Sequence, residues 1–224
     1  MENISVIIPA FNEEINISKT INIARKSTKV NDILVVNNLS TDRTEEISKE
    51  NGARVKRCNS QGKGYAMEEG IKYAKNDIIV FLDADAEYKN ENIVEDLINP
   101  IITQNMDFVK SAFDRTTGGL VTEVVVKPLL SLLFPNMYKF SEPISGMIAT
   151  KKSVLKDIIL EKDYGVDIGI LIDVIEKGYK VAEVNIGEIN NLSHINKNNQ
   201  AMAKMSTEIM KSILKRANIY KKER

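Results

Sequence analysis

Apolar runs alternate with amphipathic segments over residues 1–88 of this 224-residue chain. Runs rich in Ile, Val and Leu predict buried strands, because a continuous apolar run leaves no face for water. The predicted strands are 4–8, 33–36 and 77–82, with a further short strand at 53–56. Helices are expected over 14–27 and from about 40 and 62 onward. This alternation predicts parallel strands joined by right-handed crossovers.

The pattern changes after residue 88, where longer helical segments separate fewer strands. Helices are predicted over 90–102 and 168–175, strands over 108–113 and 181–186, and a long apolar stretch covers 124–134. The final predicted helix, 200–222, carries an apolar stripe and many lysines. It either packs on its own domain or a dimer partner, which we favour, or lies on a membrane surface.

Composition narrows the class of protein. Lys plus Arg and Asp plus Glu are both 31, so net charge does not indicate a nucleic-acid partner. Cys58 is the only cysteine, which excludes an intrachain disulfide and fits a reducing compartment. No apolar run approaches the ~18 residues of a membrane span, and no signal-peptide pattern opens the chain. We expect a cytoplasmic protein with one domain over 1–224 and no transmembrane segment.

The main candidate site follows the apolar run 78–82. Asp83 and Asp85, separated by Ala84, come directly after this predicted strand. Ligands of open α/β sheets bind at the carboxyl ends of the strands. Two carboxylates there suit Mg²⁺ or Mn²⁺, ions that usually accompany phosphates. The sequence therefore predicts a metal–diphosphate site.

Other polar residues follow neighbouring strands and could serve the same site. Asn12 and Glu13 follow the first strand, and Asn37 and Asn38 follow the second. The segment Gly62-Lys63-Gly64 opens a predicted helix. Flanking glycines allow a backbone to approach a ligand, and the lysine could reach a phosphate. A surface turn is the alternative, and the position just before the Asp83 strand favours the phosphate role.

The motifs VIIPAFNEE, Ser-Thr-Asp, GKG and FLDAD, in this order, resemble the nucleotide-binding half of family 2-like glycosyltransferases with the GT-A fold. The resemblance implies an α/β fold with a Rossmann-like half and a mixed, mostly parallel sheet flanked by helices. It implies that Asp85 binds the metal and that Asp83 holds the ribose or sugar. The nucleoside pocket would be lined by Pro9, Ala10 and Glu13.

The second half resembles the glucosyl-3-phosphoglycerate synthases through FVKSAFDR, GGLVTEVVVKPLLSLLFP, EPISGMIATKKSVL, YGVDIGILID and the late histidine. The resemblance implies that backbone N–H groups of Gly119, Leu120, Val121 and Thr122 bind an acceptor's phosphate and carboxylate. His194 would complete the metal site with Asp85, and Asn196 would touch the acceptor.

Asp167 stands where relatives place a glutamate near the reacting sugar. It is either a catalytic residue, with Asp85 and Lys63, or a first-turn acid that stabilises its helix.

Two departures from these families concern specificity. Leu120 stands where the synthases have an arginine, and leucine cannot bind phosphate in a bidentate manner. Arg115 is a candidate substitute. Asn37 and Asn38 stand where relatives usually carry an acid, which leaves the donor base open between uridine and guanosine.

The predicted function is metal-dependent transfer of a hexose, glucose by resemblance, from a UDP- or GDP-hexose to a small phosphorylated or carboxylate acceptor such as 3-phosphoglycerate. The resemblance implies retention of anomeric configuration. Residues 1–88 would bind the donor, 89–198 the acceptor, and 199–224 would form the last helix, with a homodimer possible. The alternatives are a polyprenyl-phosphate glycosyltransferase at the membrane surface and a non-catalytic nucleotide-sugar-binding module.

Overall fold

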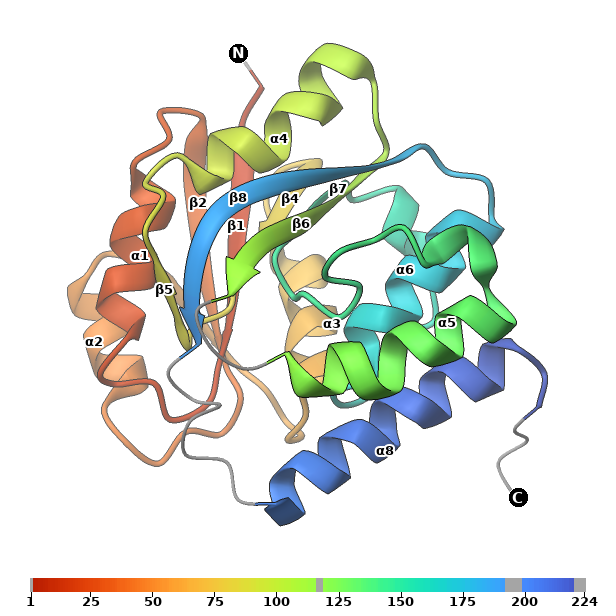
Figure 1. Cartoon of the computed structure of the whole chain (residues 1–224). Helices are drawn as coiled ribbons and strands as arrows, with labels where there is room; N and C mark the ends of the chain where they lie inside the picture. Colours follow the sequence, from red (N-terminus) through yellow and green to blue (C-terminus); the bar gives the residue numbers. More distant parts are fainter. Residues whose placement is uncertain (1, 116–118, 192–198, 220–224) are drawn as a thin grey trace.

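The computed structural model describes residues 2–115, 119–191 and 199–219 (Figure 1). In these residues one mixed sheet of eight strands runs in the order β3-β2-β1-β4-β7-β6-β8-β5. Helices pack on both faces of the sheet, in agreement with the predicted fold class.

The first half confirms the predicted alternation of strands and helices. Its strands are β1 (Ile4–Ala10), β2 (Val30–Asn37), β3 (Arg54–Arg57) and β4 (Ile78–Phe81). Its helices are α1 (Ile17–Arg25), α2 (Thr44–Glu50) and α3 (Lys63–Tyr73). All four strands pair in parallel, with β1 between β2 and β4. Their carboxyl ends therefore meet at one edge of the sheet, where polar residues follow β1, β2 and β4.

The second half adds antiparallel pairs. Its strands are β5 (Ala86–Tyr88), β6 (Phe108–Arg115), β7 (Ile148–Lys151) and β8 (Val181–Asn191). Its helical segments are α4 (Ile93–Gln104), the π-helical turn η1 (Thr122–Val126), α5 (Lys127–Leu133), the short turns η2 (Pro135–Met137) and η3 (Val154–Asp157), α6 (Val166–Glu176) and α8 (Asn199–Arg216). Strand β7 lies antiparallel between β4 and β6, which pairs in parallel with β8.

Some details differ from the sequence prediction. Strands β5 and β7 were not predicted, because three or four residues are too few to show a pattern. The last helix ends at Arg216 rather than 222. Asn218 adopts a left-handed conformation with φ of 59°, and Ile219 N–H bonds the Leu214 carbonyl, which closes the helix end.

The core has two parts, one on each face of the sheet. Ile4, Val6 and Ile8 of β1 pack with α1 and α4, whereas Ile7 contributes to the opposite cluster with α3, η1, α5, α6 and α8. This division follows from the period-two alternation of side chains along a strand.

Helix α8 packs on its own fold, the first of the predicted possibilities. Its apolar residues Met205, Ile209 and Ile213 are buried in the core. At its end, the Arg216 guanidinium donates to both carboxylate oxygens of Asp173 in α6 at 2.7 Å. None of the helices in the described ranges has the length and apolar character needed to cross a bilayer.

Candidate active site

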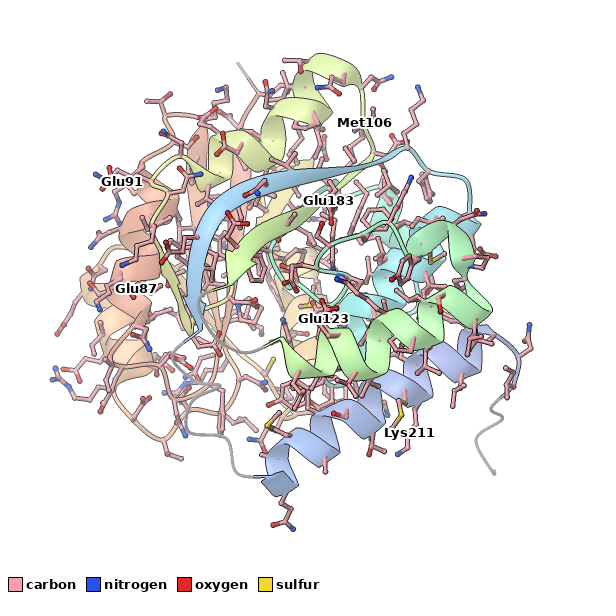
Figure 2. All side chains as sticks on the ribbon, in the orientation of Figure 1. Glu87, Glu91, Met106, Glu123, Glu183 and Lys211 are labelled. Atoms are coloured by element: carbon pink, nitrogen blue, oxygen red, sulfur yellow. The ribbon has the colours of Figure 1, made fainter. Side chains whose placement is uncertain are left out.

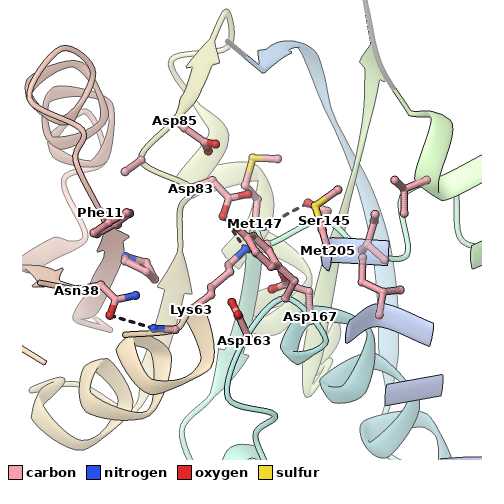
Figure 3. A pocket seen from close by; sticks show the side chains of 18 of the residues that line it. Phe11, Asn38, Lys63, Asp83, Asp85, Ser145, Met147, Asp163, Asp167 and Met205 are labelled. Carbon is pink, nitrogen blue, oxygen red and sulfur yellow. Dashed lines mark hydrogen bonds and ion pairs between the residues drawn. The ribbon is translucent and has the colours of Figure 1, made fainter. Parts of the chain in front are cut away.

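A cleft of about 610 Å³ opens at the carboxyl ends of β1, β2 and β4 (Figure 3). The first-half wall contains predicted nucleotide- and metal-site residues: Pro9, Ala10, Glu13, Asn38, Gly62, Lys63, Asp83, Ala84 and Asp85. The second-half wall contains Gly119, Leu120, Val121, Thr122, Ser145, Gly146, Asp167, Met202, Lys204 and Met205. The structure thus brings the two predicted halves of the site together around one space.

Lys63 joins the two walls by ion pairs. Its ammonium lies 2.9 Å from an Asp83 carboxylate oxygen and 2.8 Å from Asp167 Oδ2 (Figure 3). Burial alone would lower the pKa of Lys63, but the charges of Asp167 and Asp83 outweigh it and raise that pKa well above its usual value. Lys63 therefore stays positively charged across the physiological pH range.

Close packing explains why the residues on either side of Lys63 are glycines. Gly62 has a φ of 143°, and a Cβ there would lie 2.3 Å from the Lys162 carbonyl oxygen. A Cβ on Gly64 would lie 1.6 Å from the Glu161 carbonyl oxygen, and Gly64 N–H donates to the Lys162 carbonyl at 3.1 Å. The segment is therefore not a free surface turn. Its glycines let α3 press against residues 161–162, which fixes the direction of the Lys63 side chain.

Asp83 and Asp85 follow β4 as predicted. The Tyr88 hydroxyl donates to the Asp83 backbone carbonyl at 2.6 Å, which fixes the bend between β4 and β5. Asp83 faces Lys63, whereas Asp85 lies farther along the wall (Figure 3). Within the described ranges no group of three His, Cys, Asp or Glu residues could hold a metal ion. A carboxylate such as that of Asp85 is nevertheless the ligand type that Mg²⁺ and Mn²⁺ prefer. The predicted partner His194 and the acceptor residue Asn196 lie outside the described residues.

Two buried polar atoms in the cleft wall have no hydrogen-bond partner in the described structure. These are the hydroxyl of Thr122 and Oδ1 of Asp167. Buried polar groups are nearly always paired, so each atom needs a partner, which a bound ligand or an ordered water molecule can supply. Burial raises the pKa of Asp167, while the ammonium groups of Lys63 and Lys110 oppose this shift. Asp167 lies in the first turn of α6, and its carboxylate also pairs with Lys63 and lines the cleft.

Two predicted nucleotide-binding residues do not line the cleft. Asn12, with a φ of 56°, accepts a hydrogen bond from Thr41 N–H at 2.8 Å. Asn37 accepts one from Ser40 N–H at 2.8 Å and donates to Glu45 at 3.0 Å. These hydrogen bonds tie the side chains of Asn12 and Asn37 to residues 40–45.

Asn38, in contrast, lines the cleft and accepts a hydrogen bond from Gly62 N–H at 3.2 Å.

Sequence reasoning missed the support for Lys63 that comes from the second half. A Cβ on Gly146 would lie 2.3 Å from the Lys63 ammonium nitrogen and 2.4 Å from Asp83 Oδ1, so a side chain there would displace this ion pair. The neighbouring Ser145 carbonyl accepts a hydrogen bond from Lys110 at 2.5 Å, and its hydroxyl bonds that of Ser111 at 2.6 Å. The sequence signal that could have found this support is the pair Lys110 and Ser111, two polar residues inside the buried strand β6.

The fold is that of GT-A glycosyltransferases. The crystal structure of glucosyl-3-phosphoglycerate synthase from Mycobacterium tuberculosis in complex with phosphoglyceric acid superposes with a TM-score of 0.92 and 31% identity, covering 98% of this chain and 81% of that one. The same enzyme with Mn²⁺, UDP-glucose and phosphoglyceric acid gives a TM-score of 0.91. Glucosyl-3-phosphoglycerate synthase from Petrotoga mobilis is 32% identical over 98% of this chain and 74% of its own length.

The family model described as glycosyl transferase family 2 matches residues 5–159. The chain belongs to this family, and its curated and structural relatives confirm the predicted resemblance to glucosyl-3-phosphoglycerate synthases.

Proposed function

We propose that this protein transfers a glucosyl group from UDP-glucose to a hydroxyl of a small anionic acceptor of the phosphoglycerate class, with Mg²⁺ or Mn²⁺ as cofactor. The observation that carries the proposal is the two-walled cleft. One wall holds Lys63, Asp83 and Asp85, and the other presents the unpartnered atoms of Thr122 and Asp167. Similarity to enzymes solved with UDP-glucose and phosphoglyceric acid supports this assignment.

The donor would lie along the first-half wall. Pro9, Ala10 and Glu13 at the end of β1 would hold the nucleoside, with Asn38 beside them. Asp83 would hold the ribose or the sugar. The metal would be held by Asp85, and by His194 as the resemblance implies. When bound, it would supply positive charge opposite the diphosphate.

Lys63 would stabilise the departing diphosphate. Its ammonium is permanently charged and already fixed by two carboxylates, so little reorganisation is needed as negative charge develops on the leaving group. The second-half wall contributes Gly146, whose missing side chain leaves room for this ion pair.

The acceptor would lie along Gly119–Thr122. The helical run that leads into η1 begins here, and the first N–H groups of a helix have no partner within it. The Thr122 hydroxyl and Asp167 Oδ1 would bond the acceptor or the sugar. The acceptor oxygen forms a bond to the anomeric carbon while the bond to the β-phosphate oxygen breaks. The acceptor proton goes to the departing phosphate, with retention of configuration as the resemblance implies.

The test is a transfer assay with radiolabelled UDP-glucose, Mn²⁺ and 3-phosphoglycerate, in which UDP release and glucoside formation are both measured. We expect stoichiometric product and UDP. Asp85→Asn should abolish transfer while far-UV circular dichroism stays unchanged, and Asp157→Asn, at an exposed turn outside the cleft, is the control. Full activity of Asp85→Asn in EDTA would contradict the metal assignment. Binding of UDP-glucose without transfer to any acceptor would favour a non-catalytic module.

A parallel assay with GDP-glucose tests the donor base. Location in the cytoplasm, a homodimer and the division into a donor half at 1–88 and an acceptor half at 89–198 stay predictions.

A further inference from the structure

We infer that Lys110 is a positioning residue that holds the Gly146 backbone against Lys63 and balances the acids around it. The inference rests on the proposed glucosyl transfer, in which Lys63 stabilises the departing diphosphate. Lys110 is not among the described residues that line the cleft, so it would act through its neighbours rather than by touching the substrate.

Lys110 approaches the cleft wall from inside the sheet. It lies in β6, between β7 and β8, and its side chain is fully buried. Because side chains alternate along a strand, Lys110 points to the same face as Phe108, which packs in the core cluster with α3 and α6. Glu183, opposite Lys110 on β8 (Figure 2), accepts hydrogen bonds from the N–H and the hydroxyl of Ser141 at 2.7 and 3.2 Å. The Lys110 ammonium group instead donates to the Ser145 carbonyl at 2.5 Å.

Further hydrogen bonds hold Ser145 at this place in the wall. Its N–H donates to the Glu142 carbonyl at 3.0 Å. Its hydroxyl bonds the Ser111 hydroxyl at 2.6 Å and accepts the Met147 N–H at 3.2 Å. Strand β6 therefore anchors Ser145 through two adjacent side chains, those of Lys110 and Ser111.

The anchored peptide lies directly against the cleft lysine. The Ser145 carbonyl and the Gly146 nitrogen belong to one planar peptide group, so the hydrogen bond from Lys110 fixes the orientation of that group. A Cβ on Gly146 would lie 2.3 Å from the Lys63 ammonium nitrogen. The position of Lys63 thus depends on a peptide that Lys110 holds (Figure 3).

The charge of Lys110 balances the acids that surround Lys63. Asp83 and Asp167 both pair with Lys63, and two carboxylates with one ammonium group carry a net charge of −1. A negative cluster would oppose the binding of a diphosphate. The Lys110 ammonium group makes the four groups neutral. Among charged groups, Asp167, Lys63 and Asp83 influence the pKa of Lys110 most, followed by Glu142.

A buried lysine is costly, which indicates a role beyond packing. Burial is the largest cause that lowers the pKa of Lys110 to about 8. A hydrocarbon side chain of similar length would fill the same space without desolvating a charge. Strongly perturbed ionisable groups cluster at functional sites. The hydrogen bond to Ser145 and the charges around Lys63 give Lys110 such a role.

The ionisation of Lys110 predicts how catalysis depends on pH. Lys110 loses its charge as the pH rises through about 8, whereas Lys63 keeps its own. A neutral amine forms a weaker hydrogen bond than an ammonium group and supplies no positive charge. The kcat/KM for UDP-glucose, which reports ionisation of the free enzyme, should therefore fall above pH 8. Unfolding would not explain this fall, because release of the Lys110 proton stabilises the folded state over the same range.

The experiment measures kcat/KM for UDP-glucose from pH 7 to 9.5, with saturating Mg²⁺ and 3-phosphoglycerate. Lys110→Met should lower kcat/KM at pH 7 by between about tenfold and a hundredfold, with a flat profile above pH 7. The wild type should fall toward the value of this variant as the pH passes 8. The control is Lys152→Met, which should keep the wild-type profile, because the Lys152 ammonium group donates to the Ala74 carbonyl outside the cleft.

Ser111→Ala separates the anchor from the charge. It removes the hydroxyl partner of Ser145 and retains the Lys110 ammonium group. We expect a smaller loss of kcat/KM at pH 7 than in Lys110→Met, with the fall above pH 8 preserved. If Lys110→Met does not fold, as circular dichroism would show, the wild type and Ser111→Ala still test the inference, since absence of the fall in either would overturn it.

Calorimetric titration with UDP-glucose and Mg²⁺ provides a measurement that does not depend on transfer. The Kd of UDP-glucose should rise above pH 8 in the wild type and stay constant in Lys110→Met. If the wild type transfers to no acceptor while these Kd values behave as expected, the proposed function would be refuted and the role of Lys110 in positioning the donor site would stand.

Other results would overturn the inference. One is a wild-type kcat/KM that stays flat to pH 9.5. Another is a fall above pH 8 that persists in Lys110→Met, because a different group such as Asp167 would then be responsible. A Lys110→Met variant with wild-type kcat/KM and reduced stability would assign Lys110 a purely structural role.

Discussion

Lys110 offers a quantitative test of the electrostatics behind the cleft. Its side chain is fully buried in β6, and its ammonium donates to the Ser145 carbonyl at 2.5 Å. Burial lowers the pKa of Lys110 from its usual 10.5 to about 8, although the charges of Asp167, Asp83 and Glu142 oppose the shift and Lys63 adds to it. One pKa unit corresponds to about 1.4 kcal/mol, so the charged form costs the folded state about 3 kcal/mol.

The sign of the pH dependence follows from proton binding. Between pH 8 and 10.5 the unfolded chain holds a proton on Lys110 that the folded protein has released. Stability should therefore rise with pH in this window, because the unfolded state binds more protons. Lys110→Met keeps the length of the side chain but cannot titrate. We expect the unfolding free energy of the wild type, minus that of the variant, to increase by about 3 kcal/mol from pH 7 to pH 10.5.

Urea unfolding followed by circular dichroism at a series of pH values measures this difference. At pH 7 the variant also loses the hydrogen bond to Ser145, which costs about 1–3 kcal/mol and offsets the relief of the buried charge. Lys152→Met is the control, because its ammonium donates to the Ala74 carbonyl at a half-buried site. A difference that stays constant or falls with pH would refute the reasoning.

Two further predictions concern packing. Gly146→Ala should displace the Lys63–Asp83 pair and lower kcat/KM by roughly a hundredfold in the transfer assay, with little change in Tm. Gly178→Ala should do the opposite: its φ of 78° strains any side chain although nothing lies within 4 Å of the Cβ, so Tm should fall and kcat/KM should stay unchanged. Arg216→Met should lower the unfolding free energy, measured in urea, by about 3–5 kcal/mol, because it leaves Asp173 unpaired against α8. The exposed control is Lys215→Met, and a smaller loss of unfolding free energy in Arg216→Met than in this control would contradict the prediction.

The sequence predicted the first half of the fold well because its signals are local. The run at 78–82 is buried on both faces and cannot be other than a strand or a core helix, and its length favours the strand. Parallel strands place Glu13, Asp83 and Asp85 at one edge, so their proximity could be predicted as well.

The missing parts depend on long-range placement. Strand β7 acquires its position from antiparallel pairing with β4 and β6, and this insertion brings Gly146 against Lys63. The residues of a four-residue strand do not indicate which strands it pairs with. The same holds for the glycines beside Lys63, which the backbone at 161–162 approaches closely.

Residues 161–162 also contact the two helices that carry residues of the cleft walls, α3 and α8. The Lys162 carbonyl accepts the Gly64 N–H at the start of α3, while the Glu161 carboxylate receives Lys215 and Arg216 at the end of α8, at 3.0 and 2.9 Å. Helix α3 carries the donor-side lysine, and α8 carries Met202, which lines the cleft. If acceptor binding shifted α8, these contacts would carry the shift to Lys63, and the affinities for donor and acceptor would then be thermodynamically linked.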